Sequence, residues 1–137
     1  FRSGGAVIYL LYLSKIRKAG SVMNKQKKQL HYTLTLRIYG EDKCFGPGIA
    51  ELLERVDEFK SLRQATISME MAYSKAWRVI KTAEQSLGFP LLTSTTGGRG
   101  GGGAELTPQA RDFLERFRNF EEAVRGYADE AFLEIIG

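Results

Sequence analysis

The sequence is poor in the residues that most catalytic and metal sites require. Cys44 is its only cysteine and His31 its only histidine. One cysteine excludes an intrachain disulfide and a cysteine-rich zinc site, which fits a reducing cytoplasm. His31 lies next to a basic stretch and far along the chain from any acidic or nucleophilic partner, so most histidine-dependent catalytic schemes lack components. We therefore expect a cytoplasmic protein that is not an enzyme and uses no cofactor or metal.

Long hydrophobic runs are also missing. The apolar run AVIYLLYL at residues 6–13 is too short to span a bilayer, so no membrane association is predicted. Arg2 is the only basic residue before this run, and no small-residue cleavage site follows it. This is not the pattern of a cleaved signal peptide. We interpret residues 1–30 as a basic tail, either disordered or upstream sequence, and Met23 is a candidate natural start.

Charge is distributed unevenly along the chain. Residues 1–30 contain seven Lys or Arg and no acid, and residues 59–104 contain six basic and two acidic residues. The segments 31–58 and 105–137 are net acidic. A basic patch in an otherwise acidic domain indicates a polyanionic partner, although an ordinary uneven surface has the same charge pattern.

Residues 31–59 predict a strand followed by a helix. Tyr32, Leu34, Leu36 and Ile38 alternate with polar residues, and this period of two is typical of a half-buried strand. After GPG at residues 46–48 the apolar spacing becomes helical.

Two further helices follow with a short turn between them. Ser61 begins SLRQ, a capping-box sequence, and predicts a helix over residues 62–69. A second helix is predicted over residues 73–87, with Gly88 and Pro90 as its end signals. Two helices with a three- to four-residue turn are typical of a helix-turn-helix, whose second helix enters the DNA major groove. The buried side of the helix over residues 73–87 is predicted to be formed by Ala76, Ile80, Ala83 and Leu87.

The opposite side of the second helix carries residues suited to DNA. Arg78 and Lys81 can reach guanine edges or phosphates, and Ser74 can contact either. Tyr73 and Trp77 can pack on sugars or thymine methyl groups. Lys81 is better suited to a phosphate or solvent contact than to a base contact. Trp77 is as well suited to the hydrophobic core as to a contact with DNA.

The glycine run at residues 97–103 is predicted to be the tip of a wing. FPLLTST precedes it and AEL follows it as short strands, and Thr107 and Pro108 then begin a long helix. We therefore predict a mainly α fold with small β: a winged helix-turn-helix over residues 31–107 and a long C-terminal dimerisation helix over 108–137. Glycines would let backbone amides approach phosphates, with Arg99 supplying charge. A nucleotide cradle is disfavoured because no Gly-Lys-Ser/Thr follows, and a linker has a similar composition.

Apolar residues from Ala110 onward repeat at spacings of three and four, which is typical of a coiled-coil seam. The alternative is packing on the chain's own core, especially for Phe113 and Phe117. We predict a homodimer on a near-palindromic operator. The predicted dimerisation residues are Phe113, Phe117, Phe120, Val124, Tyr127 and Ala131.

Two stretches carry a family resemblance. AYSKAW at 72–77 and TGGRGGGGAELT at 96–107 resemble the DNA-binding domain of ModE-type molybdate-responsive regulators, and the segment through EQSLGFPLL resembles the wider LysR-type winged-helix group. The resemblance implies a DNA-binding transcriptional regulator. The candidate DNA-binding residues are Ser61, Tyr73, Ser74, Lys75, Trp77, Arg78, Lys81, Thr96, Gly97, Gly98, Arg99 and Gly100.

The chain departs from the ModE pattern in three ways. Ala72 stands where a capping serine is common, and Glu70 occupies a turn position where glycine or an uncharged residue is more usual. The resemblance also covers no molybdate-binding domain, so we expect either a short ModE-like form or a piece of a longer protein, and a separate effector-sensing protein is a further candidate partner. The competing functions are a dimeric protein-interaction module built on the winged helix and a small-anion binder that uses the glycine loop.

Overall fold

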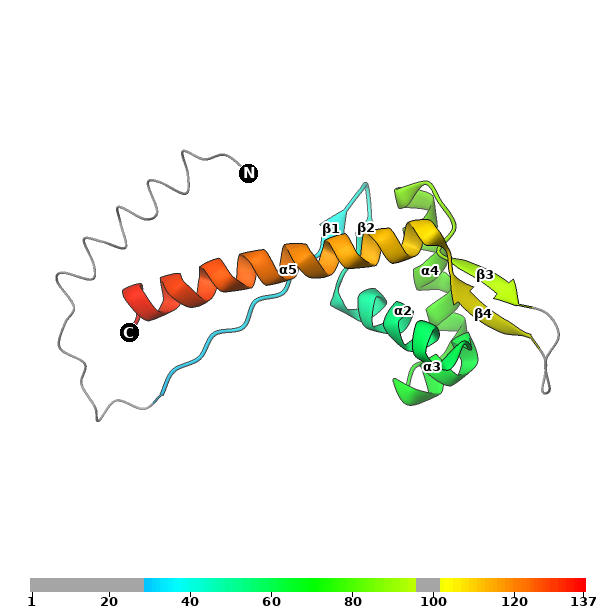
Figure 1. The fold of residues 1–137 in the computed structure, drawn as a ribbon, viewed down its shortest axis with the longest axis horizontal. Helices are drawn as coiled ribbons and strands as arrows, with labels where there is room; N and C mark the ends of the chain where they lie inside the picture. Colours follow the sequence, from blue (N-terminus) through cyan, green and yellow to red (C-terminus); the bar gives the residue numbers. More distant parts are fainter. Residues whose placement is uncertain (1–28, 96–101) are drawn as a thin grey trace. The chain divides into compact units, whose positions relative to one another are not determined.

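The computed structural model describes residues 29–95 and 102–137, which form two compact units. One unit is residues 35–120, and the other contains residues 29–34 and 121–137. Figure 1 shows the elements. They are β1 Ile38–Tyr39, β2 Lys43–Phe45, α2 Pro47–Phe59, α3 Leu62–Ser68, α4 Tyr73–Leu87, β3 Leu92–Thr95, β4 Gly103–Leu106 and α5 Pro108–Ile135.

Local signals define the ends of α2, α3 and α4. Helix α2 has Pro47 in its first turn and ends at Lys60, whose φ of 55° is left-handed. The Ser61 hydroxyl accepts a hydrogen bond from the Gln64 amide at 3.1 Å, which caps α3. Helix α4 ends at Gly88 with φ of 84°, a conformation that glycine adopts without strain. The predicted helices at 62–69 and 73–87 are confirmed.

A β-hairpin follows α4, as expected for a wing. Strands β3 and β4 are antiparallel, with Leu92 opposite Leu106 and Thr95 opposite Gly103. The Thr107 side chain caps α5 by accepting from the Ala110 amide at 3.0 Å, and its hydroxyl donates to the Pro90 carbonyl at 2.7 Å. The order of helices α2 to α4, hairpin and α5 is that of a winged helix-turn-helix with a long C-terminal helix, so the predicted fold class is confirmed (Figure 1).

The predicted strand over residues 32–38 is largely wrong. Only Ile38 and Tyr39 form a strand, and they pair with β2, which the sequence analysis missed. The alternation of exposure is nevertheless present, because Tyr32, Leu34 and Leu36 are half-buried while the residues between them are exposed. A period of two reports an extended backbone with one covered side, and it does not require a partner strand.

The core of the 35–120 unit lies where α2, α4 and the start of α5 meet the two hairpins. Its largest buried side chains include Phe45, Leu52, Ile80, Leu91 and Phe117. The predicted stripe on α4 is confirmed, with Ala76, Ile80 and Ala83 fully buried and Leu87 half-buried.

The second unit consists of an extended segment and the second half of α5. The Tyr32 ring packs on Phe132 with a centroid distance of 5.1 Å, and its hydroxyl donates to the Asp129 carboxylate. Val124, Tyr127 and Ala131 are half-buried. Among the described residues, no helix is long and apolar enough to cross a membrane.

Candidate nucleic-acid interface

The outward side of α4 presents the residues that the sequence analysis assigned to DNA. Ser74, Lys75, Arg78 and Lys81 are exposed, while Ala76 and Ile80 point into the core. The basic groups of Lys75, Arg78 and Lys81 lie within two turns of the helix. Such a row of cations on the second helix of a helix-turn-helix is suited to phosphates and base edges.

Two aromatic side chains lie beside these cations on α4. Tyr73 is 44% exposed and Trp77 is 36% exposed. Their rings meet edge to face, with a centroid distance of 6.2 Å and an interplanar angle of 78°. Of the two alternatives for Trp77, core or surface, the structure places it at the surface.

A chain of contacts connects this aromatic pair to the base of the wing. The Lys81 ammonium lies 5.3 Å from the centre of the Trp77 ring and 3.1 Å from a Glu84 carboxylate oxygen. The other Glu84 oxygen accepts from the Leu91 amide at 2.7 Å, just before β3. Glu84 was missed in the sequence analysis, although its i,i+3 spacing from Lys81 is a recognisable signal.

The turn between α3 and α4 contains a strained residue. Glu70 has φ of 53°, a left-handed conformation that is unfavourable for a residue with a Cβ. The Met71 amide donates to the Thr66 carbonyl at 2.9 Å and closes the turn. Ala72 precedes α4 in extended conformation without a side-chain cap, as its residue type implies. Both departures from the family pattern therefore have a local structural correlate.

The base of the wing rests on the connection between α2 and α3. The Ala104 amide donates to the Lys60 carbonyl at 3.0 Å. A Cβ built on Gly103 would lie only 2.6 Å from that carbonyl oxygen and 2.6 Å from Thr95 Oγ1. Gly103 is thus needed where strand β4 approaches Lys60, a purpose for the last glycine of the run that the sequence analysis did not identify.

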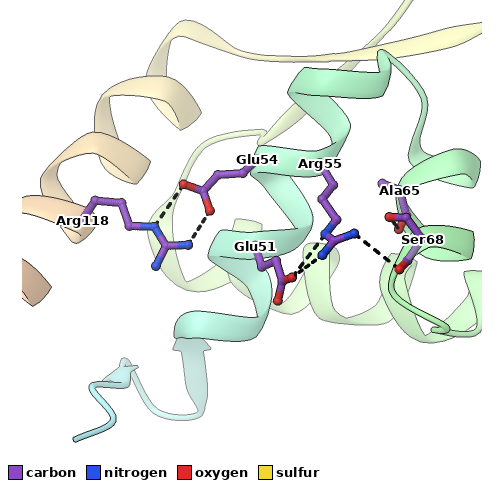
Figure 2. Close-up of polar contacts among 6 residues, drawn as sticks. All are labelled: Glu51, Glu54, Arg55, Ala65, Ser68 and Arg118. Atoms are coloured by element: carbon purple, nitrogen blue, oxygen red, sulfur yellow. Dashed lines mark hydrogen bonds and ion pairs between the residues drawn. The ribbon is translucent and has the colours of Figure 1, made fainter.

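An ion pair and a hydrogen bond connect α2 to α5 and α3 (Figure 2). Arg118 on α5 binds the Glu54 carboxylate, with Nε donating to Oε2 at 3.1 Å. Arg55 binds Glu51 at 2.7 Å and donates to the Ser68 carbonyl, the last residue of α3, at 3.4 Å. These contacts hold α3 and the start of α5 on α2, and so they support the position of the helix-turn-helix.

A further ion pair joins the end of α2 to the start of α5. Arg111 contacts the Asp57 carboxylate at 2.7 Å, and Lys60 contacts the same oxygen at 3.1 Å. The Arg111 hydrogen bond, followed by that of Lys60, lowers the pKa of Asp57.

The predicted dimerisation residues occupy different environments. Phe117 is 2% exposed, and its ring packs against Phe45 of the same chain at 5.0 Å. Phe113 is half-buried and also packs on Phe45, at 4.8 Å. These two residues therefore follow the alternative, packing on the chain's own core. Phe120 is 46% exposed, and the other three are half-buried in the second unit.

The remaining candidates divide into two groups. Ser61 caps α3, as described above, and its oxygen is occupied by the Gln64 amide. The wing-tip residues Thr96, Gly97, Gly98, Arg99 and Gly100 lie outside the described residues. Across residues 29–95 and 102–137, no group of His, Cys, Asp or Glu side chains could hold a metal ion.

Comparison with known proteins places this geometry in a family context. A family model described as "Bacterial regulatory helix-turn-helix protein, lysR family" matches residues 50–111. The chain is 31% identical over 70 residues to the molybdenum transport protein ModE of Herbaspirillum seropedicae, covering 51% of this chain and 26% of that protein. It is 30% identical over 89 residues to the transcriptional regulator ModE of Haemophilus influenzae, covering 62% of this chain and 35% of that protein.

A third similar protein is the molybdenum-pterin-binding protein MopB of Rhodobacter capsulatus, which is 29% identical over 73 residues, covering 53% of this chain and 27% of that protein. The match spans about a quarter to a third of the length of these relatives, between 26% and 35%. The matched region contains α3, the turn, α4, the hairpin and the start of α5. Residues 50–111 therefore match the model of the bacterial regulatory helix-turn-helix proteins of the lysR family, and the same region is similar in sequence to ModE proteins.

Proposed function

We propose that this chain binds double-stranded DNA as a transcriptional regulator, with α4 in the major groove and the wing against the neighbouring backbone. The observation that carries the proposal is the outward face of α4, where Lys75, Arg78 and Lys81 are all exposed within a lysR-type domain. The core side of the same helix is filled by Ala76, Ile80 and Ala83, so only the cationic face is available to DNA. A cationic face of this kind gains affinity by releasing counterions from phosphates.

The second part of the proposal is a homodimer that addresses two half-sites of a near-palindromic operator. Helix α5 has 28 residues and so extends about 42 Å at the usual rise. Its second half contains Val124, Tyr127 and Ala131 at spacings typical of a helix-pairing seam. A pair of such helices would set two copies of α4 about one DNA turn apart.

Duplex binding is tested with fragments selected from random double-stranded DNA and titrated by fluorescence anisotropy. We expect tight binding that weakens steeply between about 50 and 200 mM salt, because phosphate contacts release counterions. Arg78→Ala should relax the preference at one base position by about 1–3 kcal/mol. Arg116→Ala on α5 removes the same charge from a side chain that is 66% exposed, and it should leave the preference unchanged.

For the wing, Arg99→Ala should weaken binding to all sequences alike and reduce the salt slope by about one. Binding that is insensitive to salt, or absent from every selected duplex, would contradict the proposed function. Salt-insensitive capture of a protein partner would instead favour the interaction-module alternative.

The dimer is tested by analytical ultracentrifugation. Val124→Glu places a charge on the proposed seam and should shift the protein toward the monomer, because burying an unpaired carboxylate is unfavourable. Gly126→Glu adds the same charge to α5 at an open position, with nothing within 4 Å of an added Cβ, and should leave the oligomeric state unchanged. A monomeric parent protein would refute the dimer without affecting the proposal of duplex binding.

A further inference from the structure

We propose that Tyr73 and Trp77 form an apolar reader of thymine methyl groups, and that Lys81 positions the Trp77 ring and does not itself read a base. This inference rests on the proposed function, because it names what α4 recognises in the major groove. It decides between the two aromatic contacts left open by the sequence, sugar packing and thymine contact. It also assigns Lys81 and Glu84 to positioning.

The starting observation is that two large rings of the same helix face are left partly in solvent. Tyr73 is 44% exposed and Trp77 is 36% exposed, whereas the core side of α4 is closed by Ala76, Ile80 and Ala83. Exposed aromatic area is unfavourable in water and gains stability when an apolar partner covers it. Lys75, Arg78 and Lys81 on the same helix are exposed and add positive charge beside the pair, which complements DNA and disfavours a basic protein partner.

The second observation is that the Trp77 ring is held from two sides. Tyr73 meets it edge to face at 6.2 Å, and the Lys81 ammonium lies 5.3 Å from its centre. Lys81 is in turn held by Glu84 at 3.1 Å. A lysine ammonium within about 6 Å of the centre of an indole ring is attracted to the face of the ring.

The Lys81–Glu84 contact also restricts what Lys81 can do. Glu84 is fixed by the Leu91 amide, to which its other oxygen accepts at 2.7 Å, and its side chain is only 15% exposed. The Lys81 ammonium thus has two partners on α4 itself, the Glu84 carboxylate and the Trp77 ring, while its side chain is 62% exposed. In this proposal, its effect on base preference passes through Trp77, and its charge still contributes to binding phosphates.

Base chemistry identifies the group that the two rings can read. In the major groove, the C5-methyl of thymine is the apolar group, and the other groups on the base edges are hydrogen-bond donors and acceptors. Tyr73 and Trp77 are one helical turn apart, about 6 Å along the axis. This distance corresponds to about two base-pair steps at roughly 3.4 Å each, so the pair fits methyl groups on two thymines separated by one base pair.

Replacing thymine by uracil tests the proposal, because uracil lacks only the methyl group. A duplex selected by the parent protein is resynthesised with uracil at single positions and titrated by anisotropy. We expect a three- to fivefold loss of affinity, about the value of one apolar carbon, at one or two positions. At the position that Trp77 reads, Trp77→Ala should bind the thymine and uracil duplexes with equal affinity. Trp77 is the chain's only tryptophan, so its emission should change more with the thymine duplex.

The positioning role of Lys81 is tested with a conservative pair of variants. Lys81→Arg keeps a cation for the Trp77 ring and should preserve the thymine-to-uracil ratio, whereas Lys81→Met should lower that ratio toward one. Arg116→Ala should leave the ratio at the parent value, since it lies on α5. A ratio unchanged in Lys81→Met would overturn the positioning role.

The outcomes separate this inference from the proposed function. If no duplex binds, the proposed function fails and the inference fails with it. If duplexes bind in a salt-dependent way but every uracil substitution is silent, only the thymine reader is refuted. The thymine reader is also refuted if Trp77→Ala weakens binding to the thymine and uracil duplexes by the same factor, so that the thymine-to-uracil ratio stays at the parent value. That is the result expected if Trp77 packs on the sugar.

Discussion

Gly103→Ala should weaken the junction between the wing and the helix-turn-helix. An added Cβ would lie 2.6 Å from the Lys60 carbonyl oxygen, whereas real Cβ contacts essentially never fall below 3.0 Å. The backbone of β4 or of Lys60 must therefore move by several tenths of an ångström. Because the close atom belongs to the backbone, no rotamer change can relieve the contact.

The size of the effect follows from what that movement disturbs. It displaces the hydrogen bond from the Ala104 amide to the Lys60 carbonyl, now 3.0 Å, whose net value is about 0.5–1.5 kcal/mol. Overpacking of a well-fitted site adds strain, so we expect a total loss of about 1–3 kcal/mol. For a unit of this size, residues 35–120, that loss corresponds to a Tm lower by about 4 to 24 °C.

Thermal unfolding followed by circular dichroism measures this change. Gly126→Ala is the matched control, because an added Cβ there meets nothing within 4 Å and alanine is the better helix former. Thr95→Ala combined with Gly103→Ala should restore only part of the loss, since it removes the Oγ1 contact and leaves that with Lys60. A Gly103→Ala protein that melts with the parent would refute the close approach of the wing to Lys60.

Three further predictions follow from single residues. Glu70→Gly should raise the free energy of unfolding by about 0.5 kcal/mol, because φ of 53° strains a residue with a Cβ. Urea denaturation measures this change, and a decrease would contradict the prediction. Ser61→Ala should lower the free energy of unfolding by about 1 kcal/mol, because the hydrogen bond from the Gln64 amide is lost, whereas Ser61→Asp should retain most of the stability of the parent protein. The lowered pKa of Asp57 means that its contribution to stability is present above the normal aspartate pKa and is lost as pH falls through the folded value. Between pH 5 and pH 3, Asp57→Asn should therefore lose less Tm than the parent protein, and equal losses would refute the role of the Arg111 contact.

The local elements could be read from the sequence because their signals are local. The end of α4 needs only Gly88, and the start of α5 needs only Thr107, because a left-handed cap and a side-chain cap are satisfied within a few residues. The buried stripe of α4 and its exposed cationic face follow from the helical period in the same way. The exposure of Ser74, Arg78 and Lys81 could therefore be predicted from the sequence, whereas the surface position of Trp77 was decided by the structure.

The tertiary structure decided what depends on residues distant in sequence. The alternation at residues 32–36 could not reveal that only Ile38 and Tyr39 find a partner strand, because pairing depends on where β2 lies. Phe113 and Phe117 belong to the same apolar repeat as the second half of α5, yet their environment depends on Phe45, more than sixty residues earlier in the chain. The order of residues alone determined that the chain has a cationic helix and a glycine run. Only packing determined that Gly103 faces Lys60, since a steric contact exists only once both backbones are in place.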